Sequence, residues 1–260
     1  MNKKWILNSI LILLIIIVLG CGSYLFIYFW NAGQSEEEIR ELQKWKTEAF
    51  SEPKEQEILS DKPAILKEYQ KLYQKNHDLC GWLIIKGTKI DYPVMQTPDE
   101  PEFYLHRNYK KQKDSNGLPF LDAVCNLHKG KNNLIIYGHH MKSGFMFTDL
   151  LNYQKKEFYE NHKVIEFDTL YEKQQYEIVA VFRTRIYHDG ENEFKYYDYC
   201  GDLTRKRYES YVDQSIRASL YKTGVKPVYG EQLLTLVTCA YHEDEGRFVV
   251  VARKKGTKVK

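Results

Sequence analysis

Cysteine is scarce in this sequence, and its spacing does not suggest a covalent or metal-bound framework. The 260 residues include five cysteines, at positions 21, 80, 125, 200 and 239. The odd number and the wide spacing argue against a disulfide framework. The absence of C-x-x-C and H-x-x-x-H patterns argues against a zinc site. We therefore expect Cys80, Cys125 and Cys200 to be structural, and a pairing of Cys80 with Cys200 or Cys125 is left open.

The sequence also lacks a strong net charge, internal repeats and low-complexity tracts. The formal charge is +3 at pH 7, and leaving out Lys3 and Lys4 lowers it by two, to +1. This gives no electrostatic basis for binding nucleic acid. Residues 34–260 have a length that fits one domain.

Charged residues are absent from Trp5 to Trp30, where Ile, Leu and Val predominate. The run is longer than the roughly 20 residues needed to cross the hydrocarbon layer of a membrane. Lys3 and Lys4 precede it, and glutamates follow it at positions 36, 37, 38 and 41. Because positive residues tend to stay inside, we predict a single-pass membrane protein anchored through residues 5–30. Its N-terminus would be cytoplasmic and the rest of the chain extracellular.

The apolar run has two other interpretations. A cleaved signal peptide would need a shorter apolar core and a small-x-small site, of which Asn31–Gly33 is a poor version. Val18–Cys21 resembles a bacterial lipobox, which would make Cys21 lipidated. Since Tyr24–Trp30 is still apolar after that cysteine, an uncleaved anchor is preferred, with the lipoprotein as the minor alternative.

Helices are predicted between the anchor and a β-rich region. Ile39, Leu42 and Trp45 recur at a spacing of three on a charged background, and Pro53 interrupts the pattern before it resumes. We expect these helices to lie on the body of the protein and to space it from the membrane. A partner-binding coiled coil is the alternative, but the pattern is too short to sustain heptads.

From Gly81 the apolar pattern becomes that of short strands. The strand candidates are residues 82–85, 90–95, 119–123, 133–137, 163–168, 175–185, 233–239 and 248–253. Short helices are expected over 145–153 and 156–162, and a longer one over 202–221. About eight strands, mostly antiparallel, indicate a closed or nearly closed barrel. The predicted fold class is mostly β with added helices (α+β), divided at 1–33, 34–80 and 81–260.

A thiol and two histidines lie where predicted strands end. Cys239 ends one apolar strand, and Arg247 begins the next after a polar loop. His139 and His140 follow a third strand and Gly138. A thiol needs a nearby cation or base to become a good nucleophile. The pattern therefore favours a Cys-His-Arg site, although a single cysteine at the edge of a core is more often a packing residue.

These segments resemble the sortases, a family of cysteine transpeptidases. Thr235-Leu236-Val237-Thr238-Cys239 matches their TLxTC motif, and Tyr137-Gly138-His139-His140-Met141 is similar to the histidine segment of class B members. Further similar segments are Ile90–Val94, Phe103–Leu105, Pro119–Asp122 and Val164–Asp168. The resemblance extends from about Leu66 to Lys254. It implies an eight-stranded sortase-type β-barrel with N-terminal helices and a helix before the nucleophile strand.

The resemblance also implies roles for the site residues. Cys239 would attack a peptide carbonyl and form a thioester, and His139 would act as general acid and base. Arg247 would hold the substrate carbonyl or stabilise the oxyanion. Thr238 and Val237 are expected to bind substrate, Thr238 through its hydroxyl or its backbone N–H.

The other histidines of this region are assigned no catalytic role. His139 is preferred to His140 because neighbours on an extended strand point to opposite faces. His242 is expected to face solvent. A zinc site formed by His139, His140, Cys239 and His242 is the competing interpretation, which the residue spacing disfavours. No metal or organic cofactor is predicted.

By resemblance, the chain is predicted to be a cell-surface transpeptidase. It would cleave a sorting signal of a secreted protein after Thr and join the acyl group to an amine of peptidoglycan or its lipid-linked precursor. Class B relatives often take signals such as Asn-Pro-Gln-Thr-Asn instead of Leu-Pro-x-Thr-Gly. The alternatives are a cysteine peptidase that releases its product to water, a pilin-polymerising sortase, and a tethered binding module with an inert cysteine.

Overall fold

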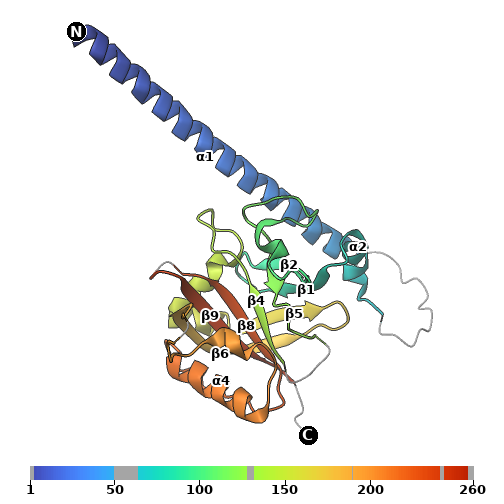
Figure 1. The fold of residues 1–260 in the computed structure, drawn as a ribbon. Coiled ribbons are helices and arrows are strands. Elements are labelled where there is room, and N and C mark those ends of the chain that lie inside the picture. The colour runs from blue at the N-terminus through green and yellow to red at the C-terminus, as the bar shows by residue number, and fades with distance from the viewer. Residues whose placement is uncertain (1–2, 50–63, 128–131, 189, 241–242, 257–260) are drawn as a thin grey trace.

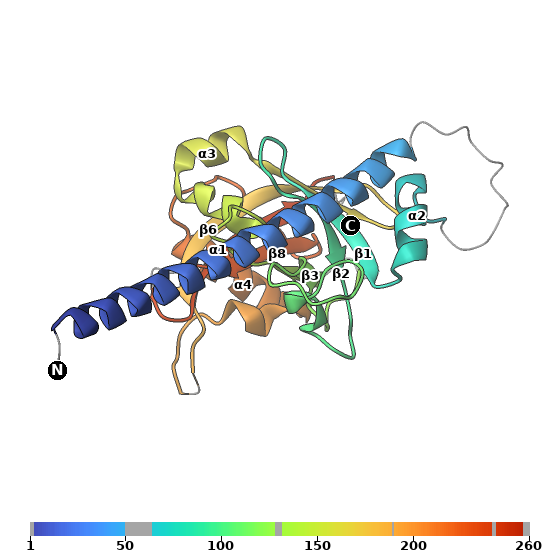
Figure 2. The same ribbon diagram turned by 90° about the horizontal axis from the view of Figure 1, so that it is seen from above.

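The computed structural model describes residues 3–49, 64–127, 132–188, 190–240 and 243–256. It consists of a long N-terminal helix and a body built on a curved sheet with helices outside it (Figure 1). Figure 1 shows that the C-terminal part of the helix reaches the body while its N-terminal part projects away, and in Figure 2, seen from above, the N-terminal end extends past the body.

Helix α1 (Lys3–Glu48) runs without interruption from the apolar segment into the body. Its stretch Asn8–Ile27 is long and apolar enough to cross a membrane, and none of it is buried. Near the other end, Ile39 and Leu42 are buried in the core. The helix expected from residue 34 is therefore the second half of one element. The change from apolar to charged residues alters the surroundings of the helix but not its backbone.

Helix α2 (Lys67–Lys75) packs beside this end of α1. Tyr69 is fully buried, and its hydroxyl donates a hydrogen bond to Asp168 at 2.8 Å. Lys46 of α1 forms an ion pair with Asp91 at 3.2 Å. Both helices therefore lie on the body, as predicted. Pro53 lies outside the described residues.

The strands of the described chain close into a barrel. They are β1 (Leu79–Ile84), β2 (Asp91–Met95), β3 (Phe120–Leu121), β4 (Asn132–Tyr137), β5 (Val164–Thr169), β6 (Gln175–Arg185), β7 (Gly201–Asp202), β8 (Leu233–Cys239) and β9 (Gly246–Lys254). Their order is β3-β2-β1-β5-β6-β9-β8-β4, the β3–β4 pairing closes the ring, and β7 adds to β4 outside it. The pairs β2–β3 and β4–β8 are parallel, and the others are antiparallel. The predicted eight-stranded, mostly antiparallel barrel is confirmed.

Helices connect and cover these strands. They are the 3-10 helices η1 (Phe103–His106), η2 (Phe147–Gln154) and η3 (Tyr196–Tyr199), and the α-helices α3 (Lys156–Asn161) and α4 (Arg205–Ala218). Helix α4 begins after Thr204, whose side chain accepts a hydrogen bond from the Arg207 amide. This is the helix expected before the nucleophile strand, shorter at both ends than the predicted 202–221.

Alternation along the strands separates two cores. Leu234 and Leu236 of β8 point into the barrel, where they join the main apolar cluster. Leu233 and Val237 point outward and pack in a second cluster with residues of η3 and α4. Because side chains alternate along a strand, Cys239 lies on the outer face with Val237. The outer face at the end of β8 is therefore where the thiol becomes accessible.

Candidate active site

The strand register brings Cys239, His139 and Arg247 to one level on the outer face. Parallel pairing sets Tyr137 of β4 opposite Val237 of β8, and the Gly138 amide extends the ladder to the Val237 carbonyl at 3.0 Å. Two residues beyond this pair stand His139 and Cys239. On the other side of β8, Cys239 pairs directly with Arg247 of β9. The thiol thus lies between an imidazole and a guanidinium on neighbouring strands.

These residues line a cavity of about 420 Å³. Its walls come from η1, the segment after β3, the end of β6 and η3, while the ends of β4, β8 and β9 form its base. The lining residues are Pro101, Glu102, Leu105, Phe120, Asp122, Ala123, Tyr137, Gly138, His139, Ile186, Tyr196, Tyr197, Val237, Thr238, Cys239 and Arg247. All five residues predicted for the site, including Val237 and Thr238, are in this set. Such a concave site with aromatic walls and a few polar groups is typical of ligand pockets.

His139 is held by a backbone carbonyl of η1. Its Nε2 lies 2.7 Å from the Leu105 carbonyl oxygen, and its ring stacks on His106 with centroids 5.4 Å apart. A carbonyl only accepts, so Nε2 carries the hydrogen and Nδ1 is the nitrogen that can accept a proton. Burial lowers the pKa of His139, and His106 lowers it further, while the Leu105 carbonyl raises it. The imidazole is therefore kept neutral at pH 7, which suits a base.

His140 occupies a different environment from its neighbour. It is not among the residues that line the cavity, and it forms an isolated β-bridge with Met146. Burial lowers the pKa of His140, while a hydrogen bond with the Cys239 backbone raises it. The two histidines thus face opposite sides of the extended chain. His242, the third histidine considered, lies outside the described residues.

Arg247 is fixed by the loop that precedes it. Its Nη1 donates to the carbonyl oxygens of Glu245 at 3.0 Å and Gly246 at 3.1 Å. A guanidinium has five N–H donors, so these contacts leave the Nε and Nη2 hydrogens for a ligand. Thr238 is 2% exposed, and its hydroxyl has no hydrogen-bond partner among the described residues.

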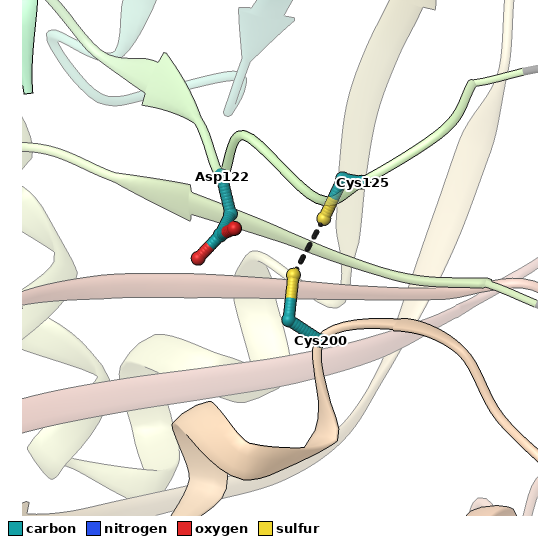
Figure 3. Close-up of side chains that lie close together, drawn as sticks. All are labelled: Asp122, Cys125 and Cys200. Carbon is teal, nitrogen blue, oxygen red and sulfur yellow. Dashed lines mark hydrogen bonds between the residues drawn. The ribbon is translucent and has the colours of Figure 1, made fainter. Parts of the chain in front are cut away.

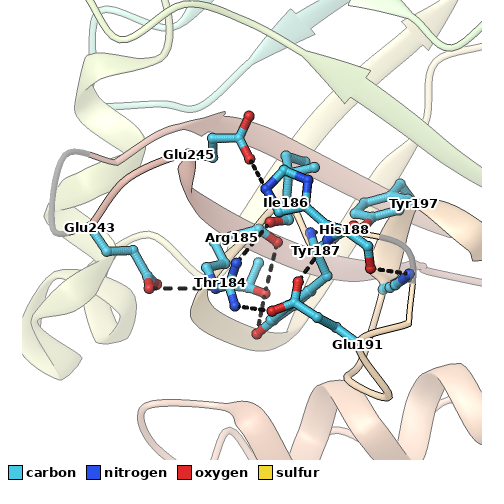
Figure 4. A network of polar contacts seen from close by, with 10 residues as sticks. Thr184, Arg185, Ile186, Tyr187, His188, Glu191, Tyr197, Glu243 and Glu245 are labelled. Atoms are coloured by element: carbon cyan, nitrogen blue, oxygen red, sulfur yellow. Dashed lines mark hydrogen bonds and ion pairs between the residues drawn. The ribbon is translucent and has the colours of Figure 1, made fainter.

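Polar contacts join the β8–β9 loop to the segment after β6 (Figure 4). The Ile186 amide donates to the Glu245 carbonyl at 3.2 Å, and His188 Nε2 lies 3.6 Å from a Glu245 carboxylate oxygen. Arg185 contacts both Glu191 and Glu243. The Glu243–Glu245 loop therefore braces the segment from which Arg247 extends. No motif in the sequence marks this pairing.

Several lining residues were not assigned a role from the sequence. Tyr196 and Tyr197 come from η3, far along the chain from either motif. Leu105 lies in a segment already noted for its resemblance, but its contribution is a carbonyl that any residue carries. Among the described residues, one group of side chains is close enough to hold a metal ion, namely Asp122, Cys125 and Cys200. It does not include the histidines of the zinc interpretation.

The chain is similar to known proteins over most of its length. The family model described as the Sortase domain matches residues 83–255. Sortase B of Staphylococcus aureus is 29% identical over 255 residues, 97% of this chain and 98% of that protein. Sortase B of Listeria monocytogenes is 35% identical over 188 residues, 71% of this chain and 72% of that protein. The structure of a Staphylococcus aureus sortase B–substrate complex is 29% identical with a TM-score of 0.72, and the match covers 88% of this chain and 98% of that one.

Proposed function

This chain belongs to the sortase family, cysteine transpeptidases that anchor or process surface proteins, and we propose that Cys239, His139 and Arg247 are its catalytic residues. One observation carries this assignment. The ladders β4–β8 and β8–β9 put the thiol between the other two side chains, on the face that lines the cavity. Neighbouring strands lie roughly 4.8 Å apart, so all three groups can contact one bound peptide bond.

The first half of the proposed reaction acylates the enzyme. His139 takes the thiol proton on Nδ1, and the Cys239 sulfur attacks the carbonyl carbon of the Thr in a sorting signal. The carbonyl electron pair moves to oxygen, where N–H groups of Arg247 stabilise the negative charge. When the tetrahedral intermediate collapses, the C–N bond breaks, His139 returns its proton to the departing amine, and a thioester remains.

The second half transfers the acyl group to an amine. We propose a peptidoglycan amine, or that of its lipid-linked precursor, as the acceptor. His139 removes a proton as the amine nitrogen attacks the thioester, and the thiol of Cys239 leaves. The Staphylococcus aureus sortase B was solved as a substrate complex, which supports a bound substrate for this chain as well. Val237 and Thr238 would bind this substrate, since they line the base of the cavity.

The experiment is to incubate the full chain in detergent with a small set of sorting-signal pentapeptides. Intact mass measurement detects the thioester, and product analysis with and without an added amine separates transfer from hydrolysis. Cys239→Ala should form no adduct. His139→Ala should slow acylation by about 10²–10⁴, and His140→Ala, the matched control, should lose far less. A wild-type rate in His139→Ala together with a large loss in His140→Ala would reverse the assignment.

The position of the chain in the cell is part of the proposal. Residues 1–33 would form the cytoplasmic end and the anchor, 34–80 the helical segment, and 81–260 the catalytic barrel on the outer side. The apolar stretch Asn8–Ile27 and the lysines before it support this orientation. Protease added to intact cells should digest the body of the protein. Protection of the body until the membrane is broken would contradict the orientation.

A further inference from the structure

Two cysteines outside the catalytic site face each other at close range. The sulfur atoms of Cys125 and Cys200 are 2.8 Å apart, although the residues are 75 positions apart in the chain (Figure 3). Cys125 lies in the segment after β3, and Cys200 lies between η3 and β7. Cys125 is buried, with its sulfur also close to the Asn133 carbonyl and the Ile135 amide of β4.

The framework on both sides keeps the two sulfurs together. The strand β7 that follows Cys200 pairs with β4, with Asn133 opposite Gly201. The Asn133 side chain donates to the Tyr199 carbonyl at 3.1 Å. The Cys125 amide donates to the Asp122 carbonyl at 3.1 Å, and the Asp122 amide in turn donates to the Ile135 carbonyl of β4 at 2.9 Å. Each cysteine is therefore fixed to the same strand by contacts independent of the sulfur atoms.

The distance distinguishes the possible states of this pair. Non-bonded heavy atoms pack best at about 3.5–4.0 Å, so 2.8 Å is too close for two thiols merely in contact. Two thiolates on one tetrahedral zinc ion, each at about 2.3 Å, would lie roughly 3.8 Å apart. A disulfide bond is about 2.05 Å long. The sulfurs are thus closer than a shared metal ion requires and lie between non-bonded contact and a covalent bond, so that a small shift of either side chain brings them to bonding distance.

We propose that Cys125 and Cys200 form a disulfide bond that fastens two walls of the active-site cavity to each other. Asp122 and Ala123 precede Cys125 on one wall, and Tyr196 and Tyr197 precede Cys200 on the other. The inference rests on the proposed function in one respect, the location of the body outside the cytoplasm, where disulfides persist.

The bond forms by exchange with a disulfide of the general form RSSR, either a small molecule or a thiol oxidoreductase. One cysteine thiolate attacks RSSR and releases RS⁻, and the second cysteine attacks the mixed disulfide and releases the other RS⁻. Two protein thiols and RSSR thus give one protein disulfide and two RSH. The hydrogen bond with Cys125 and burial raise the pKa of Cys200. The Cys200 thiol of the folded protein is therefore a poor nucleophile, and exchange is expected during folding.

The test examines the full chain taken from membranes without reductant. Free thiols are blocked with N-ethylmaleimide, and the protein is digested and analysed by mass spectrometry without reduction. We expect a linked peptide pair containing Cys125 and Cys200, lighter by two hydrogen atoms than the two thiol peptides, and label on Cys239. Cys80→Ser, the matched control, should keep the link. Cys80 is partly buried, and its thiol donates to the Val94 carbonyl at 3.2 Å.

A second measurement keeps the inference testable if a cysteine variant folds poorly. Reductant should lower the thermal unfolding midpoint of wild type and of Cys80→Ser, but not that of Cys125→Ser, which has no bond to lose. Label on both Cys125 and Cys200, or a bound metal ion that Cys125→Ser no longer holds, would overturn the inference. Acylation of Cys239, measured on a portion of the same preparation that has not been treated with N-ethylmaleimide, shows whether the proposed function has survived that result.

Discussion

Replacing Gly138 by alanine should disturb both the stability of the fold and the position of the histidine. A Cβ atom at Gly138 would lie 2.6, 2.7 and 2.9 Å from ring atoms of Phe147. Phe147 is fully buried, and its amide donates to the His139 carbonyl at 2.8 Å. The Phe147 ring therefore cannot move away without displacing His139, which lines the cavity.

The expected loss of stability is that of an overpacked core. Overpacking a well-packed core costs about 1–3 kcal/mol, so we expect the free energy of unfolding to fall by about 2 kcal/mol. Activity should fall more, because a displacement of about 1 Å in a catalytic group can reduce the rate roughly 100-fold. Urea unfolding and the rate of Cys239 acylation by a sorting peptide, measured on the full chain, give the two quantities.

Two further variants decide whether the reason is correct. Gly33→Ala is the matched control, because nothing lies within 4 Å of a Cβ atom there. It should leave the acylation rate unchanged and should not lower the free energy of unfolding, since alanine is favoured over glycine inside a helix by about 1 kcal/mol. Adding Phe147→Leu to Gly138→Ala should recover part of the loss, since residues in contact are energetically coupled. Wild-type stability and rate in Gly138→Ala, or strictly additive effects in the double variant, would refute the reasoning.

Three other outcomes are expected. Arg247→Lys should lower the acylation rate by a factor of up to about 10²–10³, with little change in the unfolding midpoint. The reason is that the lysine ammonium cannot replace the several directed N–H donors of the guanidinium. A rate within a fewfold of wild type would argue against an oxyanion role. His106→Gln removes one influence that lowers the pKa of His139, so the pKa of His139 should rise. In a pH–rate profile, activity should then be lost at a higher pH on the acid side. An unchanged or lower value of that pH would count against His139 as the base. Thr235→Val removes a buried hydroxyl that is hydrogen-bonded to Tyr211 and Asn133, and it should lower the free energy of urea unfolding by about 1–3 kcal/mol. Thr238→Val should leave that free energy nearly unchanged. Equal losses in the two variants would contradict this hydrogen-bond assignment.

The barrel could be predicted because its strands are short, apolar and separated by polar turns. Side chains alternate along a strand, which explains why His139 and Cys239 share a face. Each lies two residues beyond Tyr137 and Val237, which are paired on neighbouring strands. The sequence could not show that β4 and β8 are adjacent and parallel, because that pairing joins segments about a hundred residues apart. The family resemblance supplied what the periodicity could not.

Other features depend on information that residue identity does not carry. The contact between His139 and Leu105 uses a backbone oxygen, so no side chain marks it. Cys125 and Cys200 have no motif spacing, and the pairing left open from the sequence involved Cys80 instead. Helix α1 appeared as two segments because its surroundings change after Trp30, while its backbone continues unbroken.

The unbroken course of α1 determines how the enzyme would stand on its membrane. A flexible linker lets a domain adopt many orientations, whereas a continuous helix acts as a rigid spacer. The roughly 20 residues between the apolar stretch and the end of α1 span about 30 Å at 1.5 Å per residue. Ile39 and Leu42 pack in the core and fix this part of the helix to the body. With the proposed anchor in a membrane, the opening of the cavity would be held at a fixed height and orientation above the membrane surface, and a substrate polypeptide would approach it from one direction.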